Sequence, residues 1–292
     1  MINVSPLETR VALVSQGRLR EMFLEQKSYP SLVGNVYLGR VTKILSGANA
    51  AFVDCGLERS AFLSAKDARL SEDDKDKEPY ISDFVQEGSD IMVQVVKEPV
   101  ADKGARIRSR IALAGRYLVF MPNEHTINIS RRLTDTKERA RLTALAEGAI
   151  DPSDGVILRT VAGGVDSDDL ANELLSLKAR WVGIQETAEQ VQAPSPIYAD
   201  VDPVLRNLRD RLSNSIDAVL IDDRATFSAA RSFCERFVPA LSGRIELLST
   251  PGSAFDNYDL EQQIEEMSWP EVPLRSGGTL YIEEPQAMSV IG

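Results

Sequence analysis

Alternating apolar and polar residues in the first hundred positions predict short β-strands. Residues 9–24 (TRVALVSQGRLREMFL) alternate on both sides of Ser15-Gln16-Gly17, which is typical of a β-hairpin. Further alternating runs extend from residue 36 to about residue 96, and they are separated by glycines and by an acidic segment at residues 68–80. About five short strands at this spacing favour a small closed barrel over a βαβ unit. The acidic segment is expected to be a solvated loop.

The second half of the chain changes to a pattern in which helices alternate with strands. The expected helices cover residues 136–148, 167–185, 202–214, 225–238 and 257–267, and the expected strands cover residues 117–122, 154–164, 217–223 and 244–249. The alternation that follows a linker at residues 192–200 predicts a layered α/β domain. Residues 273–292 predict a Gly-Gly turn and two further strands.

Length and composition narrow the class of protein. A chain of 292 residues exceeds the usual size of one domain. The two cysteines, Cys55 and Cys234, lie far apart with no C-x-x-C spacing, so we expect buried thiols and neither a zinc site nor a disulfide framework. The sequence has no signal-peptide pattern and no apolar stretch of about 18 residues that could cross a bilayer, so a cytoplasmic protein is expected. Catalysis by histidine is not expected, because the only histidine, His125, lies in a predicted loop.

The charge of the chain is unevenly distributed. The formal net charge is −11, which argues against a general nucleic-acid coat protein. Residues 97–132, however, carry eight lysines and arginines against three acidic residues. Because screening limits the reach of each charge to about 8–10 Å at physiological salt, this local basic patch can still bind phosphate.

One face of the predicted barrel combines aromatic and basic side chains. They are Tyr37, Arg40, Lys43, Phe52, Arg59 and Phe62. Such a face matches an oligonucleotide-binding (OB) fold, in which bases stack on rings and cations follow the phosphates. Periodicity alone favours a position in the barrel core for Phe52 and Phe62, and that alternative stays open.

Eight segments of the sequence, in the same order, resemble the N-terminal half of the bacterial ribonuclease E/G family. They are GNVYLGRV, NAAFVDCGLERSAFLS, VQVVKE with KGARI, LAGRYLVFMPN, ISRR, ILRT, LIDD and LRSGGTLYIEEPQAMSVI. The resemblance runs from about Val11 to Ile291, and the eight segments together are far more specific than any one of them.

The resemblance implies an α+β multidomain fold. An RNase H-like α/β domain, residues 1–34 and 195–267, would be split by two insertions. These are an OB-fold RNA-binding barrel at residues 35–112 and a 5′-sensor domain at residues 113–194. Residues 268–292 would be the incomplete start of a DNase I-like domain.

The resemblance also implies an RNA-binding site on the barrel. The family clamps single-stranded RNA with two aromatic residues and a lysine, which correspond to Phe52, Phe62 and Lys103. We add Tyr37 and Arg40 to the predicted RNA contacts because they belong to the same aromatic and basic set.

A second implied site would sense a 5′ monophosphate. It corresponds to Arg159 and Thr160, with Ile129 and Ser130 beside them. A guanidinium fork and a hydroxyl together suit a dianionic phosphate. Two departures from the family would weaken this site: the connection before ISRR lacks the usual glycine pair, and acids stand where a basic or hydroxyl side chain is usual. Those acids are Asp166, Asp168 and Asp169.

The family's reaction is Mg²⁺-dependent endoribonucleolytic cleavage of RNA, but no catalytic or metal-binding residue is assigned here. The family's first metal aspartate corresponds to Gly292, which has no side-chain oxygen for a hard cation. The paired carboxylates Asp222-Asp223 and Glu283-Glu284 are interpreted as a helix cap and as part of an exposed strand, respectively.

Three functions stay open at this point. The first is an endoribonuclease whose metal ligands come from residues beyond Gly292 or from a partner chain. The second is a module that holds single-stranded RNA without cutting it, and the third is an unrelated OB-fold adaptor, which would leave the α/β segments unexplained.

A homo-oligomer is one further option, but the zinc-linked dimer of some relatives needs a cysteine pair that this sequence lacks. Because two strands alone leave unpaired edges, the last 25 residues are expected to be disordered or to pair with another chain.

Overall fold

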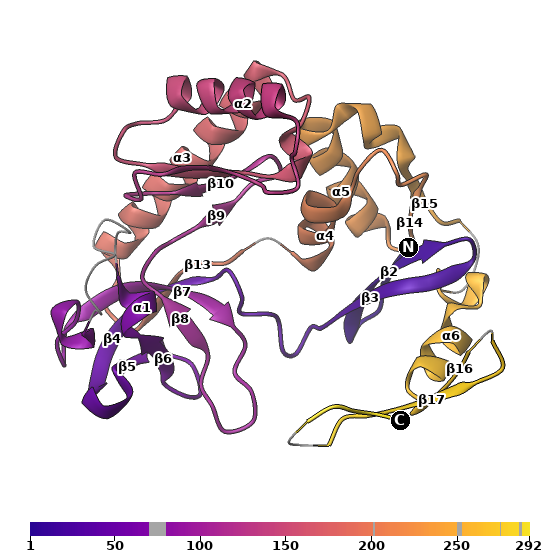
Figure 1. The fold of residues 1–292 in the computed structure, drawn as a ribbon, viewed down its shortest axis with the longest axis horizontal. Coiled ribbons are helices and arrows are strands. Elements are labelled where there is room, and N and C mark those ends of the chain that lie inside the picture. The colour runs from indigo at the N-terminus through magenta and orange to yellow at the C-terminus, as the bar shows by residue number, and fades with distance from the viewer. Residues whose placement is uncertain (70–79, 201, 250–252, 275, 286–287) are drawn as a thin grey trace. The chain divides into compact units, whose positions relative to one another are not determined.

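The chain forms two compact units in a computed structural model (Figure 1). The structure describes residues 1–69, 80–200, 202–249, 253–274, 276–285 and 288–292. The split unit comprises Met1–Pro30 and Pro203–Gly292, and the inserted unit comprises Ser31–Asp202. Most of the acidic segment predicted as a loop lies outside the described residues.

Five strands of the inserted unit close into an OB-like barrel. They are β4 (Val36–Leu45), β5 (Ala50–Asp54), β6 (Ala61–Ser64), β7 (Asp90–Lys97) and β8 (Arg106–Arg108), with the short helix α1 (Ala65–Ala68) after β6. The sheet order β4-β5-β6-β8-β7 is closed by a pairing between β7 and β4, which confirms the predicted barrel. A sixth strand, β13 (Ser195–Tyr198), pairs with β4, so residues 195–202 belong to the inserted unit rather than to the later α/β segments.

Alternation along the barrel strands separates a core face from an outer face. Ala51 and Val53 of β5 and Ala61 and Leu63 of β6 are fully buried in one cluster. The residues between them point to the outside, because successive side chains of a strand lie on opposite faces. This alternation decides where the aromatic residues of the barrel lie.

The rest of the inserted unit is a four-stranded sheet with two helices. The strands are β9 (Leu113–Ala114), β10 (Leu118–Met121), β11 (Ile127–Ile129) and β12 (Gly155–Leu158), in the order β11-β12-β10-β9, and the helices are α2 (Thr136–Ala149) and α3 (Ser167–Gln190). Asp135 caps α2 by accepting hydrogen bonds from the backbone N–H groups of Lys137 and Glu138, as a polar N-cap residue does. The strand expected over residues 154–164 is shorter than predicted and ends at Leu158.

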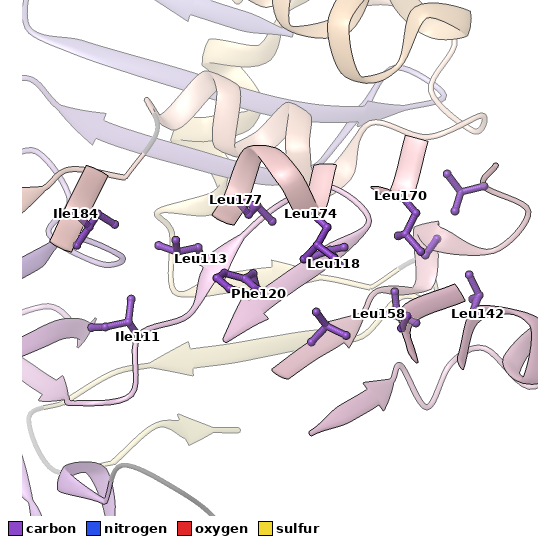
Figure 2. Packing of buried hydrophobic residues seen from close by; sticks show 14 of the residues in the cluster. Ile111, Leu113, Leu118, Phe120, Leu142, Leu158, Leu170, Leu174, Leu177 and Ile184 are labelled. Atoms are coloured by element: carbon purple, nitrogen blue, oxygen red, sulfur yellow. The ribbon is translucent and has the colours of Figure 1, made fainter. Parts of the chain in front are cut away.

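Leucines of α3 spaced three, four and seven residues apart cover this sheet. Figure 2 shows Leu170, Leu174 and Leu177 facing Leu118 and Phe120 of β10. Each such buried side chain contributes about 1.5–3 kcal/mol to the free energy of unfolding. The amphipathic pattern therefore fixes α3 against the sheet.

The split unit is built on a mixed sheet with helices on both faces. Its strands are β1 (Ile2–Val4), β2 (Glu8–Ser15), β3 (Arg18–Gln26), β14 (Val219–Ile221) and β15 (Ile245–Leu247), in the order β15-β14-β1-β2-β3, and its helices are α4 (Pro203–Arg211), α5 (Arg224–Phe237) and α6 (Leu260–Met267). The predicted hairpin is confirmed as β2 and β3, which turn at Gln16 and Gly17, both with positive φ, as a tight hairpin turn requires. Val11 packs with α4 and α5, whereas Ala12 packs with the start of α6 on the other face.

The chain ends in a small antiparallel sheet of three strands rather than two. They are β16 (Glu271–Pro273), β17 (Thr279–Glu283) and β18 (Val290–Ile291), in the order β16-β17-β18. Its apolar side chains are exposed, among them Val272, Tyr281, Ile282 and Ile291. Within the described residues, no helix has the length and apolar character needed to cross a bilayer.

Candidate nucleic-acid interface

Two aromatic rings stand side by side on the outer face of the barrel. Phe52 of β5 and Phe62 of β6 are directly opposite in the antiparallel ladder, and their ring centroids are 6.3 Å apart at an interplanar angle of 70°. Both side chains are partly exposed, whereas their neighbours along each strand are buried. The two phenylalanines therefore lie outside the barrel core, where a base can reach them.

Two basic side chains lie on the strands beside this aromatic pair, and a third lies in a neighbouring loop. Lys43 of β4 is in register with Phe52, and Arg106 of β8 is in register with Phe62, so each cation lies on the strand next to a ring. Lys103 is exposed in the loop before β8. The outer face thus combines rings with positive charge.

The loop that carries Lys103 is held tightly against β6. A Cβ added to Gly104 would lie only 2.0 Å from the carbonyl oxygen of Ser60, so only glycine fits this approach. The backbone N–H of Phe62 donates to the carbonyl of Ala105 at 2.8 Å. Lys103 is therefore fixed beside the strand that carries Phe62.

The cations of this face differ in how far their charge is compensated. Arg40 forms an ion pair with Asp90 at 2.8 Å, and Arg106 forms one with Asp67 at the same distance. Within the described residues, Lys43 and Lys103 make no ion pair. The charges of these two lysines are therefore not compensated by an ion pair among the residues that the structure describes, unlike those of Arg40 and Arg106.

Two predicted RNA contacts change in the structure. Tyr37 is 6% exposed and packs in the barrel core, so it cannot offer a ring face to a base and is removed from the RNA-binding set. Arg40 is exposed, but its hydrogen bond to the Asp90 carboxylate raises its pKa and offsets its charge. The structure therefore gives Arg40 a partner within the barrel.

The four residues predicted to sense a phosphate meet at one edge of the four-stranded sheet. Strands β11 and β12 are parallel, and Ile129 pairs with Leu158. The residues that follow these strands, Ser130 and Thr160, place their hydroxyl oxygens 2.8 Å apart. Their meeting follows from the pairing, since the carboxyl ends of neighbouring parallel strands share an edge.

Arg159 directly precedes Thr160 and is hydrogen-bonded to the turn from β9 to β10. Its Nη1 donates to the carbonyl of Gly115 at 2.8 Å, and its backbone N–H donates to the carbonyl of Tyr117 at 2.7 Å. The side chain is half-buried. These contacts fix the direction of a guanidinium that otherwise has many rotamers.

A buried carboxylate that the sequence analysis did not select completes this region. Glu173 of α3 is 5% exposed and accepts hydrogen bonds from the backbone N–H groups of Arg116, Tyr117 and Leu118 at 2.6, 2.7 and 3.0 Å. Burial raises its pKa, although these N–H groups oppose the shift. The available signal was an acid on the apolar face of α3, directly before Leu174.

The segment that follows Thr160 is tied to α2. Glu138 accepts from Arg141 and from the backbone N–H of Gly164 at 2.8 Å, and these bonds lower its pKa to about 2. The acids that depart from the family pattern lie just beyond. Asp168 and Asp169 occupy the first turn of α3, where negative charge stabilises a helix.

The paired carboxylates of the split unit are engaged in structural contacts. Asp222 accepts from the Asn3 side chain at 2.7 Å and from the backbone N–H groups of Val4 and Ala254. Asp223 caps α5 through the backbone N–H of Thr226. No cluster of three or more His, Cys, Asp or Glu suited to a metal occurs in the part of the chain that the structure describes. These residues do not fit a magnesium centre, and no cleavage step is derived from them.

Comparison with known proteins shows the family of the chain. A model of the ribonuclease E/G family matches residues 112–292. The whole chain aligns with Ribonuclease G of Haemophilus influenzae at 40% identity and with Ribonuclease G of Escherichia coli K12 at 36%, covering 61% of each relative. Ribonuclease E of Haemophilus influenzae is 33% identical over 97% of the chain and 31% of the relative. The chain thus spans about three fifths of the length of the Ribonuclease G relatives, and it belongs to the ribonuclease E/G family.

Proposed function

We propose that this chain binds single-stranded RNA on the outer face of the barrel. The observation that supports it best is the partly exposed pair Phe52 and Phe62, with Lys43 on the next strand and Lys103 in the loop before β8. Stacking on an aromatic ring contributes about 1–3 kcal/mol per base and does not depend on sequence. Uncompensated lysines next to the rings attract the phosphates between stacked bases. A buried barrel face would offer neither interaction.

The sheet edge around Arg159 and Thr160 is proposed as the site that receives the 5′ monophosphate of the RNA. A guanidinium and two adjacent hydroxyls, those of Ser130 and Thr160, offer donors that suit a dianionic phosphate. Exposed Arg131 and Arg132 add positive charge beside Ser130. The nearby acids of α3 are engaged at a helix start, but their charge reduces the attraction.

The domain assignments extend the same proposal. The barrel is assigned as the OB-fold RNA-binding domain, the four-stranded sheet with α2 and α3 as the 5′-sensor domain, and the mixed sheet of the split unit as the RNase H-like domain. The small terminal sheet is assigned to the start of a DNase I-like domain. The OB-like closure of the barrel and the mixed sheet with helices on both faces support these assignments.

Ribonucleolytic activity in RNA processing is proposed for the protein by similarity to relatives named Ribonuclease G and Ribonuclease E. Cleavage would need Mg²⁺ and oxygen ligands that the described residues do not bring together, so the function argued for this chain itself is RNA binding. A cytoplasmic location and self-association stay predictions.

The test uses one labelled single-stranded RNA prepared with a 5′ monophosphate or a 5′ hydroxyl. Fluorescence anisotropy measures binding, and gel electrophoresis measures cutting with Mg²⁺ or with a chelator. Binding of both RNAs, tighter for the monophosphate, is expected. Metal-dependent cutting would show that the chain carries a complete catalytic site, and absence of binding to either RNA would refute the proposal.

A further inference from the structure

We infer that Glu173 is a positioning residue for phosphate recognition, because it holds the turn that directs Arg159. This inference rests on the proposed role of Arg159 as a phosphate ligand. Glu173 lies on a different element from the proposed ligands and does not itself face a phosphate. It would act on Arg159 through the backbone of residues 115–118, and its charge lies close enough for the Arg159 guanidinium to lower the pKa of the Glu173 carboxyl group.

The carboxylate of Glu173 organises the turn between β9 and β10. Three consecutive backbone N–H groups, those of residues 116, 117 and 118, point at its two oxygens. The turn is closed by the backbone N–H of Gly115, which donates to the carbonyl of Leu118 at 2.8 Å. An ionised carboxylate can accept all three bonds because both of its oxygens are acceptors. A glutamine side chain would place its NH2 group against one of these backbone N–H donors.

The same turn supplies the contacts that direct Arg159. The carbonyl of Gly115 accepts from Nη1 of Arg159, and the carbonyl of Tyr117 accepts from its backbone N–H. Glu173 binds the N–H side of this turn and Arg159 binds its carbonyl side. A change in the position of the carboxylate is therefore passed to the guanidinium through a single short segment.

The fit between the carboxylate and the turn leaves no spare room. A Cβ on Gly115 would lie 2.6 Å from Cδ of Glu173 and 2.7 and 2.9 Å from its two oxygens. Glycine at this position is required for the close approach. This contact provides a second way to disturb the carboxylate, by displacing it without removing its charge.

The first variant is Glu173→Gln, which keeps the size of the side chain but turns one end of it into a donor. Its matched control is Glu189→Gln, an exposed position on the same helix. The measured quantity is the ratio of the dissociation constants for 5′-hydroxyl and 5′-monophosphate RNA. A purely structural role would change both constants together and leave the ratio unchanged.

We expect Glu173→Gln to lower this ratio by about tenfold, the equivalent of one charge-assisted hydrogen bond, with little change for 5′-hydroxyl RNA. Glu189→Gln should behave as the wild type. In an Arg159→Lys background, Glu173→Gln should have no further effect on the ratio, because its action passes through the guanidinium. An unchanged ratio in a folded Glu173→Gln protein overturns the inference.

A second variant tests the positioning role of Glu173 if Glu173→Gln does not fold, as judged by circular dichroism. Gly115→Ala keeps the carboxylate and should also lower the ratio. If neither variant folds, Glu173 is a structural residue and the inference is wrong. If the wild type itself does not prefer the monophosphate, the proposed sensor fails first, and the inference fails with it.

Discussion

Phe52 and Phe62 face each other across β5 and β6 on the outer side of the barrel, with their ring centroids 6.3 Å apart. Their edge-to-face geometry is an ordinary one for aromatic pairs, yet each ring is left partly exposed. Replacing either by Ala should weaken binding of single-stranded RNA by about 1–3 kcal/mol, and both together by about 2–6 kcal/mol. Fluorescence anisotropy with a labelled RNA measures the loss.

Tyr37 provides the control for the two phenylalanines. It is buried among the barrel strands, so Tyr37→Ala should lower the free energy of unfolding by about 3–5 kcal/mol, as large-to-small core changes do. Urea denaturation of the three alanine variants separates the two roles. Loss of stability in Phe52→Ala or Phe62→Ala of the size expected for Tyr37→Ala would place those rings in the core after all.

Lys103 should contribute to RNA binding through its charge. Lys103→Ala removes an exposed cation, so the plot of log affinity against log salt should become shallower by about 0.7. The matched control is the double variant Arg40→Ala with Asp90→Ala, which removes an ion pair of no net charge and should leave the slope unchanged. Equal slopes for wild type and Lys103→Ala would show that this lysine does not contact the backbone of the RNA.

Cys55 should be unreactive in the folded protein. Burial, and secondarily the charge of Asp54, raise its pKa to about 12, so about one thiol in ten thousand is ionised at pH 8. Cys234 is buried as well. Ellman's reagent at pH 8 should therefore detect no thiol in the native state and both cysteines in denaturant. Rapid labelling of one thiol in the native protein would contradict the buried position of Cys55.

Glu173 should give a defined pH dependence of stability. Burial makes the pKa of Glu173 higher in the folded state than in the unfolded state. The folded protein therefore takes up a proton on the Glu173 carboxylate at a higher pH than the unfolded protein does. The free energy of unfolding of the wild type, measured relative to Glu173→Gln, should therefore increase as the pH is lowered from 7 toward about 4.5, the ordinary pKa of a glutamate side chain. A relative stability that decreases over this range would mean that the three N–H bonds outweigh burial.

The sequence predicted the barrel, the hairpin and the helices because each depends on a local period of apolar residues. The meeting of Ser130 and Thr160 came from the family resemblance, and the pairing of β11 with β12 explains it. Tyr37 was misplaced because it lies three positions before Arg40, so alternation along β4 puts the two side chains on opposite faces. The β-bulge after Val41 explains only how Lys43 reaches the same face as Arg40. Glu173 was missed because the signal it gives, an acid on the apolar face of α3, does not show which backbone groups the carboxylate binds.

The terminal sheet β16-β17-β18 should be the part of the chain most open to protease. Among the described residues, its outer strands β16 and β18 each pair along one edge only, and Tyr281, Ile282 and Ile291 of the sheet are exposed. Brief digestion with proteinase K, followed by mass spectrometry, should find cleavage confined to the residues after Met267. Pairing with a second copy through these edges would instead give protection that increases with protein concentration. A terminus that resists protease at every concentration would show that the sheet is stable alone, against the expectation from its open edges and exposed apolar side chains.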